Sequence, residues 1–311
     1  MQAEKKKVMV SLTAHESELA LIDQCMNYLW VGGVDGVVIH INAHSNFHTE
    51  RFIAYCRCMS QWFEGKIFIN PYGVGITPHS QDVRIVTNLH RAHISNFLYL
   101  TECGVNFDHF ALDASNSLLI RPGLSQYIQN APCNLLEQAE MPKDWSWLLF
   151  VLADENLARD VAQIKISGHE GSCYQRDVFQ KIVKSIMAYE FAEQSSILSG
   201  RPRVEYPREE VLFASYFFKH FKDTPTQTNY IDLPWNRYLV WHLDEVKNHI
   251  ASHFENFKHK YGIKRVARDF NDPIRAFIGK TYGYRDEILA HLPTDTGAQD
   301  PRRGSPVVSS Y

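Results

Sequence analysis

The sequence predicts an α/β fold in which a mostly parallel sheet is flanked by helices. The first observation is that short β-rich runs alternate with helical patterns over residues 7–115. The second is that a chain of 311 residues with 45% hydrophobic content can bury a large core. A regular alternation of strands and helices is typical of a parallel sheet with helices on both faces.

The elements follow in order. KVMVSLTA at 7–14 is a predicted strand, and SELALIDQCMNYLW at 17–30 has apolar residues at helical spacing. Further strands are expected at 36–42, 66–71 and 107–115, with helices at 49–63 and 83–102 between them. Downstream, 166–190 predicts a short strand, a turn and a long helix, and a further helix begins near Pro207. In such a sheet, ligands bind at the carboxyl ends of the strands.

Polar residues follow each predicted strand at that edge. His15 ends the first strand, Asn42 the second and Asn70 the third, and Asp113 to Ser117 (DASNS) follow the fourth. Convergence of such residues is what a nucleotide or sugar pocket requires. The sequence therefore places a candidate binding site there.

Composition excludes several other classes. The net charge is −3 and the pI is near 6.6, without a basic stripe, so nucleic acid is not an expected partner. No signal peptide or transmembrane segment is recognisable, which predicts a cytoplasmic protein.

The six cysteines form no Cys-x-x-Cys pair and are expected to be buried free thiols. GVGIT at 73–77 lacks the spacing of a P-loop, and no G-x-G-x-x-G opens the first helix.

A metal site is not predicted, although the chain has 15 histidines. His40, His44 and His48 are four residues apart, but the first lies in a strand, so the three do not share a helical face. No His-Glu-x-x-His and no clear Asp-x-Asp occurs. Lys264, Arg265 and Arg268 form instead a cationic group that is either a solvated face or a site for a leaving diphosphate.

Glu209 and Glu210 lie directly before an aromatic helix, in YPREEVLFASYFFKHF at 206–221. Acids in a first helical turn complement the helix dipole, which favours a structural role for both. The alternative is that one is a general base. The residues alone leave this open.

The order of motifs resembles that of the core 2 and I-branching β-1,6-N-acetylglucosaminyltransferases and the protein xylosyltransferases. The similar segments are a strand ending at His15, Ile39-His40-Ile41-Asn42, FALDASNSLLI at 110–120, Gly171-Ser172-Cys173-Tyr174 with Arg176-Asp177, and Pro207 with Glu209-Glu210. They span about residues 7–275. Compared with the family pattern, Asn42 replaces an aspartate, Ser117 an aspartate and Tyr174 a tryptophan, and Asp269 stands at the lysine of the basic motif, beside Arg268.

This resemblance implies a GT-A-type fold and an inverting glycosyl transfer that requires no divalent metal. The implied partners are a nucleotide-sugar donor, a UDP- or GDP-sugar, and a glycan acceptor. Glu210 aligns with the family's base, while Glu209 is expected to cap the helix and face solvent. The expected donor-binding residues are His15, Asn42, Asp113, Asn116, Lys264, Arg265 and Arg268, and the expected acceptor-binding residues are Glu170, Tyr174 and Glu209.

Two other functions fit the same residues. A sugar- or nucleotide-binding protein of this fold without turnover is one, and a metal-dependent hydrolase that uses the histidines is the other. For the glycosyltransferase we expect a single domain of GT-A type at 1–291, with a nucleotide-binding half at about 1–125 and an acceptor and catalytic half at about 126–291. The segment 292–311 is rich in Pro, Gly, Ser and Asp and is expected to be a poorly ordered tail.

Overall fold

The computed structural model describes residues 5–14, 17–74, 78–79, 85–86, 89–131, 134–136, 139–232, 241–253 and 259–292. His15, Cys133 and the predicted tail after Leu292 lie outside these residues. For 78–79 and 85–86 only the backbone is described.

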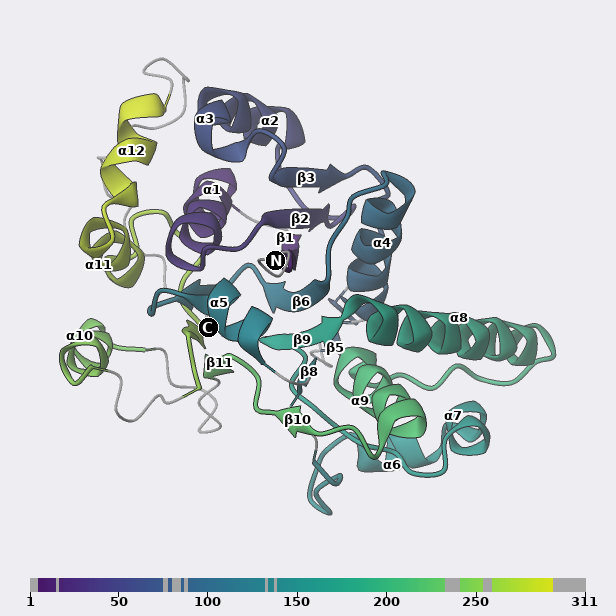
Figure 1. Ribbon diagram of the computed structural model, residues 1–311. Helices are drawn as coiled ribbons and strands as arrows, with labels where there is room; N and C mark the ends of the chain where they lie inside the picture. The colour runs from purple at the N-terminus through teal and green to yellow at the C-terminus, as the bar shows by residue number, and fades with distance from the viewer. Residues whose placement is uncertain are drawn as a thin grey trace.

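A seven-stranded sheet in the order β10-β8-β9-β6-β1-β2-β3 forms the centre of the protein (Figure 1). β1, β2, β3 and β6 are parallel, and β9 is antiparallel to both β6 and β8. The strands are β1 (Val8–Ala14), β2 (Gly36–Ile41), β3 (Ile67–Asn70), β6 (His109–Ala114), β8 (Asn134–Leu135), β9 (Ser172–Gln175) and β10 (Thr226–Gln227). The predicted α/β fold, with a mostly parallel sheet flanked by helices, is confirmed in this arrangement.

Two smaller sheets accompany it. β7 (Ser117–Leu119), β12 (Gly262–Lys264) and β11 (Ile231–Asp232) form a three-stranded sheet, and β4 (Pro78–His79) pairs with β5 (Ile85–Val86). β12 runs antiparallel to β7 and pairs Lys264 with Ser117. The small sheet thereby carries a distant part of the chain to the end of β6.

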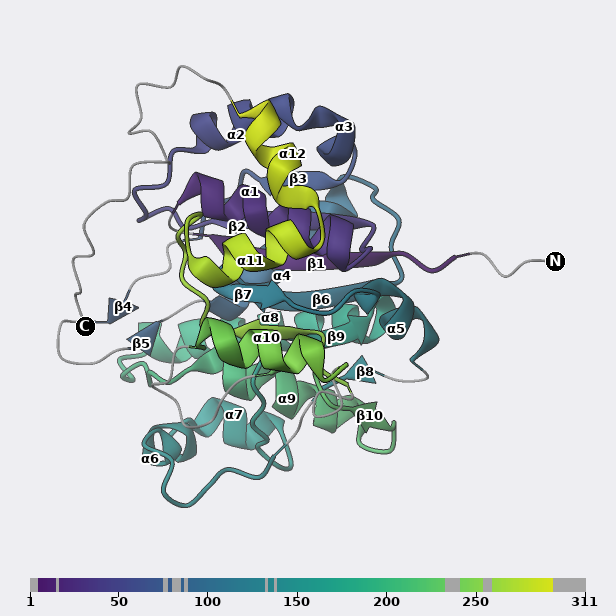
Figure 2. The same ribbon diagram turned by 90° about the vertical axis from the view of Figure 1, so that its left-hand side faces the viewer.

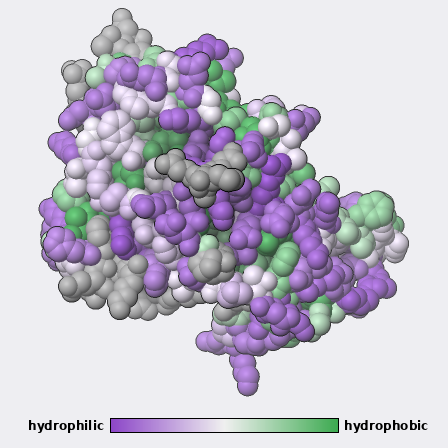
Figure 3. Space-filling model, viewed as in Figure 1, coloured by the Kyte–Doolittle hydropathy of each residue, from purple (hydrophilic) through white to green (hydrophobic). Residues whose placement is uncertain are grey.

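Helices cover both faces of the main sheet (Figures 1 and 2). They are α1 (Glu18–Met26), η1 (Asn27–Val31), α2 (Thr49–Cys58), α3 (Ser60–Phe63), α4 (Leu89–Glu102), α5 (Leu124–Asn130), α6 (Leu148–Leu152), α7 (Glu155–Asp160), α8 (Arg176–Leu198), α9 (Arg208–Phe221), α10 (Leu243–Ala251), α11 (Pro273–Thr281) and α12 (Tyr284–His291). Each helix in the described part of the chain is too short or too polar to cross a membrane. The surface seen in Figure 3 is largely hydrophilic, with smaller hydrophobic patches.

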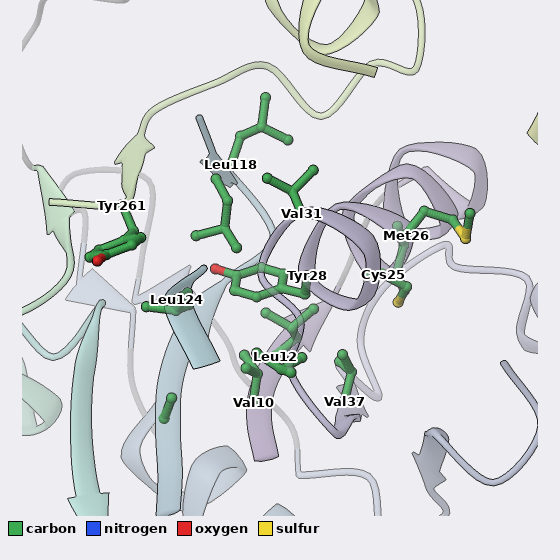
Figure 4. Close-up of a cluster of buried hydrophobic side chains, with 14 of the residues drawn as sticks. Val10, Leu12, Cys25, Met26, Tyr28, Val31, Val37, Leu118, Leu124 and Tyr261 are labelled. Carbon is green, nitrogen blue, oxygen red and sulfur yellow. The ribbon is translucent and has the colours of Figure 1, made fainter. Parts of the chain in front are cut away.

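A hydrophobic cluster lies on each face of the main sheet, because alternate residues of a strand point to opposite faces. Val10 and Leu12 of β1 belong to the cluster beneath α1 and η1, where Tyr28 packs among them (Figure 4). Met9 belongs to the second cluster, which lies against α4, α8 and α9. In that second cluster Phe110 and Phe179 are fully buried, with their ring centroids 5.0 Å apart.

The predicted helix at 17–30 divides into α1 and the π-helical turn η1. The wider turn brings Asn27 against β7 and Tyr28 against the end of β6. The Asn27 amide donates to Leu119 O at 2.9 Å and its oxygen accepts from Leu119 N at 2.8 Å. Local periodicity does not reveal a π turn that is stabilised by such tertiary hydrogen bonds.

Two other expectations are partly wrong. The helix predicted at 83–102 begins at Leu89, because 85–86 pair with 78–79 as a strand. Cys25 and Cys173 are buried free thiols as expected, whereas Cys58 and Cys103 are exposed. Cys58 ends α2 and Cys103 follows α4, and the apolar residues around them do not indicate that these two side chains reach the surface.

Candidate functional site

The interior changes from apolar to polar along the strands on the face that packs against α4 and α9. Met9 of β1 and Val38 of β2 are apolar. Further toward the carboxyl end, Ser11, His40 and Asn70 are buried on β1, β2 and β3. β1 runs leftward from the N-terminus in Figure 2, so the carboxyl edge of the sheet is on the left there. This polar interior lies where the fold class places ligands.

Lys264 and Arg268 flank the turn between β6 and β7. Lys264 pairs in register with Ser117, and Arg268 Nε donates to Ser115 Oγ at 2.8 Å. Both side chains are half-buried. The cationic segment is therefore folded onto the turn that follows β6 and is not simply a solvated face.

Arg265 and Asn116 also lie at the turn between β6 and β7. Arg265 has φ +74°, which turns the chain, and the next amide, Val266 N, donates to Asn116 O at 3.0 Å. Asn116 Oδ1 and Arg265 Nη1 are both buried without a hydrogen-bond partner. Because buried polar atoms are nearly always paired, these two are suited to meet a ligand.

Asp113 does not have the role expected of a donor-binding residue. Its carboxylate is fully buried and accepts hydrogen bonds from the Tyr28 hydroxyl, from the Tyr230 hydroxyl at 3.2 Å and from Ala114 N at 2.8 Å. Burial raises the pKa of Asp113 to about 6, although these donors oppose the change. Asp113 therefore fastens β6 to η1, and both of its oxygens accept hydrogen bonds from within the fold.

Asn42 directly follows β2, which lies two strands from β6 in the main sheet. The backbone N of Asn42 donates to Ala14 O at 2.9 Å, and its side-chain Oδ1 accepts from His44 N at 3.1 Å. Asn42 thus belongs to the carboxyl edge near β1, as expected, but on the far side of β1 from the 113–117 turn.

Glu170 is held between β9 and the small sheet. Gly171 N donates to Leu112 O at 2.8 Å, and Asn229 Nδ2 donates to Glu170 O at 3.1 Å. Gly171 has φ +77°, and a Cβ there would lie 2.6 Å from Ile231 N, so the turn requires glycine. The close approach places Glu170 next to β12.

The Glu170 carboxylate forms an ion pair with Lys264 Nζ, and His169 Nε2 lies 3.4 Å from Glu170 Oε1. Burial would raise the pKa of Glu170, but the charges of His169 and Lys264 and the Lys264 hydrogen bond outweigh it, so the pKa falls to about 2. Glu170 is therefore ionised at neutral pH.

Glu209 and Glu210 start α9 beside this pair. Ser167 N donates to Glu210 O at 2.8 Å, which joins the 167–170 turn to the helix. Burial and then the charge of Glu170 raise the pKa of Glu210 to about 7. Burial and the charge of Glu210 raise the pKa of Glu209 to about 8.

The expectation that Glu209 faces solvent is wrong. Its side chain is only 6% exposed, and Oε2 is buried without a hydrogen-bond partner. Glu210 is the more exposed of the two. The tertiary packing of the 167–170 turn against α9, which no local pattern shows, buries Glu209.

Tyr174 is not placed to contact an acceptor. It is fully buried on β9, with its ring centroid 5.3 Å from that of Phe179 and 6.1 Å from that of Phe217. The resemblance suggested a binding role, but the strand turns this ring into the core.

A metal centre is not assembled by the residues that the structure describes: no three of their His, Cys, Asp or Glu side chains are placed to hold an ion. His40 is buried, whereas His44 and His48 are exposed in the following loop. The three histidines therefore do not converge.

The structure adds His93 and His169 to the candidate site, and the sequence does not indicate a role for either. His93 on α4 accepts or donates a hydrogen bond with Ser11 Oγ at 2.8 Å, and its ring centroid lies 5.5 Å from that of His169. A weak signal was available, since His90 and His93 lie three apart on one helical face. Their neighbour His169 is distant in sequence, and only the folded chain brings it there.

Comparisons with known proteins give structural similarity alone. A scan of protein-family models and a search of curated proteins each find no match. Among solved structures, an active-site mutant of LgtC is similar, with a TM-score of 0.45 and 11% identity over 93% of this chain and 97% of that one. The apo-form glycosyltransferase GlyE of Streptococcus pneumoniae TIGR4 has a TM-score of 0.41 and 10% identity over 91% of this chain and 63% of that one. The apo bifunctional glycosyltransferase WbbM has a TM-score of 0.35 and 11% identity over 92% of this chain and 52% of that one. At this level of similarity, function has to be inferred from the site itself.

Proposed function

We propose that the chain is an inverting glycosyltransferase that moves a sugar from a nucleotide-sugar donor to a hydroxyl group of a glycan acceptor, without a divalent metal. One observation carries the proposal. Glu210, a partly exposed carboxyl group at the start of α9 whose pKa is near 7, lies close enough to Lys264 for their charges to interact, and Lys264 belongs to the cationic segment that is folded onto the end of β6. A base of that pKa beside a cationic segment suits glycosyl transfer.

The reaction would be a single displacement. Glu210 accepts the proton of the acceptor hydroxyl while that oxygen forms a bond to the anomeric carbon. The bond from the anomeric carbon to the diphosphate oxygen breaks, and attack from the opposite face inverts the configuration. Glu170, ionised and next to Glu210, would orient the acceptor by accepting a hydrogen bond from a second hydroxyl.

Cationic side chains would stabilise the leaving group. Arg265 has an unpartnered buried Nη1, and Arg268 and Lys264 lie on the same turn. At the position where a second metal-binding aspartate would follow Asp113 by two residues, the chain has Ser115. The diphosphate charge would thus be met by guanidinium and ammonium groups, as in the family that the order of motifs resembles.

The test is nucleotide-sugar turnover by wild type and by two variants in the presence and absence of EDTA. Glu210→Gln should lower kcat roughly 100-fold or more and leave donor binding close to wild type. Glu209→Gln is the comparison variant. Glu209 is protonated at neutral pH, and glutamine has nearly the same shape and charge and keeps a donor and an acceptor, so its loss of kcat should be much smaller than that of Glu210→Gln. An inactive Glu209→Gln with an active Glu210→Gln would overturn the assignment.

The same assay separates the alternatives. Turnover that survives EDTA with inverted product supports the proposal. Turnover that EDTA abolishes indicates a metal-dependent enzyme, and donor binding without turnover indicates a binding protein. Product anomeric configuration, read by NMR, tests the inverting mechanism directly.

A further inference from the structure

Three buried imidazole nitrogens without partners belong to two neighbouring side chains, His93 and His169, whose ring centroids lie 5.5 Å apart. His93 is fully buried and uses Nδ1 for its hydrogen bond with Ser11, which leaves Nε2 unpartnered. His169 is 3% exposed, and neither of its ring nitrogens makes a hydrogen bond, because the 3.4 Å approach to Glu170 lacks hydrogen-bond geometry. Buried polar atoms are seldom left unpaired, so such a group is suited to a ligand that completes it.

Glu209 lies in the first turn of α9, to which the segment that carries His169 is joined. Its Oε2 is also buried without a partner, and Ser167 ties the turn that carries His169 to the first turn of α9. Burial lowers the pKa of His169 to about 4 and raises the pKa of Glu209 to about 8. At neutral pH both side chains are uncharged, and each can donate one hydrogen bond and accept another.

Charge around this group disfavours an anionic ligand. Glu170 is ionised, and Glu210 is partly ionised at neutral pH. The ammonium group of Lys264 is already paired with Glu170. Glu170 and Glu210 would repel a carboxylate on the bound sugar. Sugar hydroxyl groups, in contrast, can form hydrogen bonds with the uncharged imidazole and carboxyl groups at little electrostatic cost.

We propose that His169 and Glu209 line a subsite for the transferred sugar of the donor, that this sugar is uncharged and rich in hydroxyl groups, and that sugars bearing a carboxylate are rejected. His93 is a positioning residue behind His169. The proposal rests on the proposed function, since it takes the diphosphate to lie on the 264–268 segment and the anomeric carbon to lie next to Glu210.

The test measures what the sugar adds to nucleotide binding. The full chain is titrated by calorimetry with UDP and GDP, with the corresponding nucleotide-hexoses, and with nucleotide-hexuronates. In wild type the hexose should strengthen binding about tenfold over the nucleoside diphosphate alone, and the hexuronate should not strengthen it. Equal gains from hexose and hexuronate would overturn the proposal.

His169→Phe removes the polar atoms and keeps the ring. It should abolish the hexose increment and leave the Kd for the nucleoside diphosphate unchanged, and His169→Gln should restore part of the increment. His109→Phe is a matched control, because His109 is also 3% exposed with two unpartnered ring nitrogens, but it begins β6 at the opposite edge of the sheet. A full increment in His169→Phe, or an equal loss in His109→Phe, would refute the subsite.

Two outcomes are handled separately. If His169→Phe does not fold by circular dichroism, His169→Gln decides, with at least a threefold smaller increment expected. If neither UDP nor GDP binds, the proposed function fails, and free hexose and hexuronate are compared by saturation-transfer NMR on wild type and His169→Gln. Hexose binding that His169→Gln weakens would retain the uncharged-sugar subsite, and no binding of hexose would overturn it.

Discussion

Glu209→Gln should make the protein more stable at high pH. The Glu209 side chain is buried without a cationic partner on its Oε2, and its folded-state pKa is about 8 in place of 4.5. Because the folded pKa is raised, folding favours the protonated carboxyl group, and stability is lost as the pH rises from about 4.5 through 8. Glutamine stays neutral and removes that loss.

The magnitude follows from the two pKa values. Each pH unit between them lowers the free energy of unfolding of wild type by about 1.4 kcal/mol, which gives at most about 5 kcal/mol at pH 9. At pH 5 the variant should lie within about 1 kcal/mol of wild type, because Glu209 is then protonated in the folded state and only partly ionised in the unfolded state.

Urea unfolding at pH 5, 7 and 9 measures this difference. Glu50→Gln is the control, because Glu50 also lies in the first turn of a helix, α2, but is exposed, and it should leave the pH dependence as in wild type. A difference between Glu209→Gln and wild type that is the same at pH 5 and pH 9 would refute the burial argument. A variant that is less stable at pH 9 would refute it more strongly, since it would mean that the ionised carboxylate has a partner.

Other substitutions test the supports of the site. Glu170→Gln should lower the free energy of unfolding at pH 7, because Lys264 loses its partner. It should also reduce the loss of stability between about pH 4.5 and 2, where ionised Glu170 otherwise stabilises the fold. Urea unfolding midpoints measured against pH test both effects. Arg275→Met should cost about 3 to 5 kcal/mol in urea unfolding, because buried Asp23, 3.1 Å from Arg275 Nη1, would lose its nearest cation. Gly171→Ala should cost about 2 kcal/mol or more by the same assay and weaken nucleotide-sugar turnover, because it combines a positive φ with a contact of 2.6 Å. An Arg275→Met protein as stable as wild type, or an unaffected Gly171→Ala, would contradict these assignments.

The cationic segment shows what sequence can predict about this site. Lys264, Arg265 and Arg268 were expected to form a group that could meet a diphosphate, and β12 brings them to the turn after β6 by pairing with β7. Like-charged residues close together in sequence are a useful signal, because their repulsion has to be offset by something else in the folded protein. Their role toward a donor stays a prediction.

Buried polar residues were predicted less well. Asp113 and Tyr174 were assigned to ligands from the order of motifs, yet one is bonded by two tyrosine hydroxyls and the other lies in the aromatic core. The sequence does not indicate a role for His93 or His169. The orientation of a buried polar side chain depends on partners that are distant in sequence, so neither periodicity nor motif order determines it.

Glu209 and Glu210, at the start of α9, combine a recognisable sequence pattern with burial that depends on distant residues. Each on its own is a normal first-turn residue that the helix dipole would stabilise by a few tenths of a kcal/mol. The fold sets a larger effect against this, because it packs the 167–170 turn and ionised Glu170 against them and raises both pKa values. A chain that needed only a helix cap would be more stable with these acids exposed. We infer that the unfavourable burial is retained because it keeps one carboxyl group neutral for hydrogen bonding and brings the other, Glu210, to a pKa at which it can take and return a proton near neutral pH.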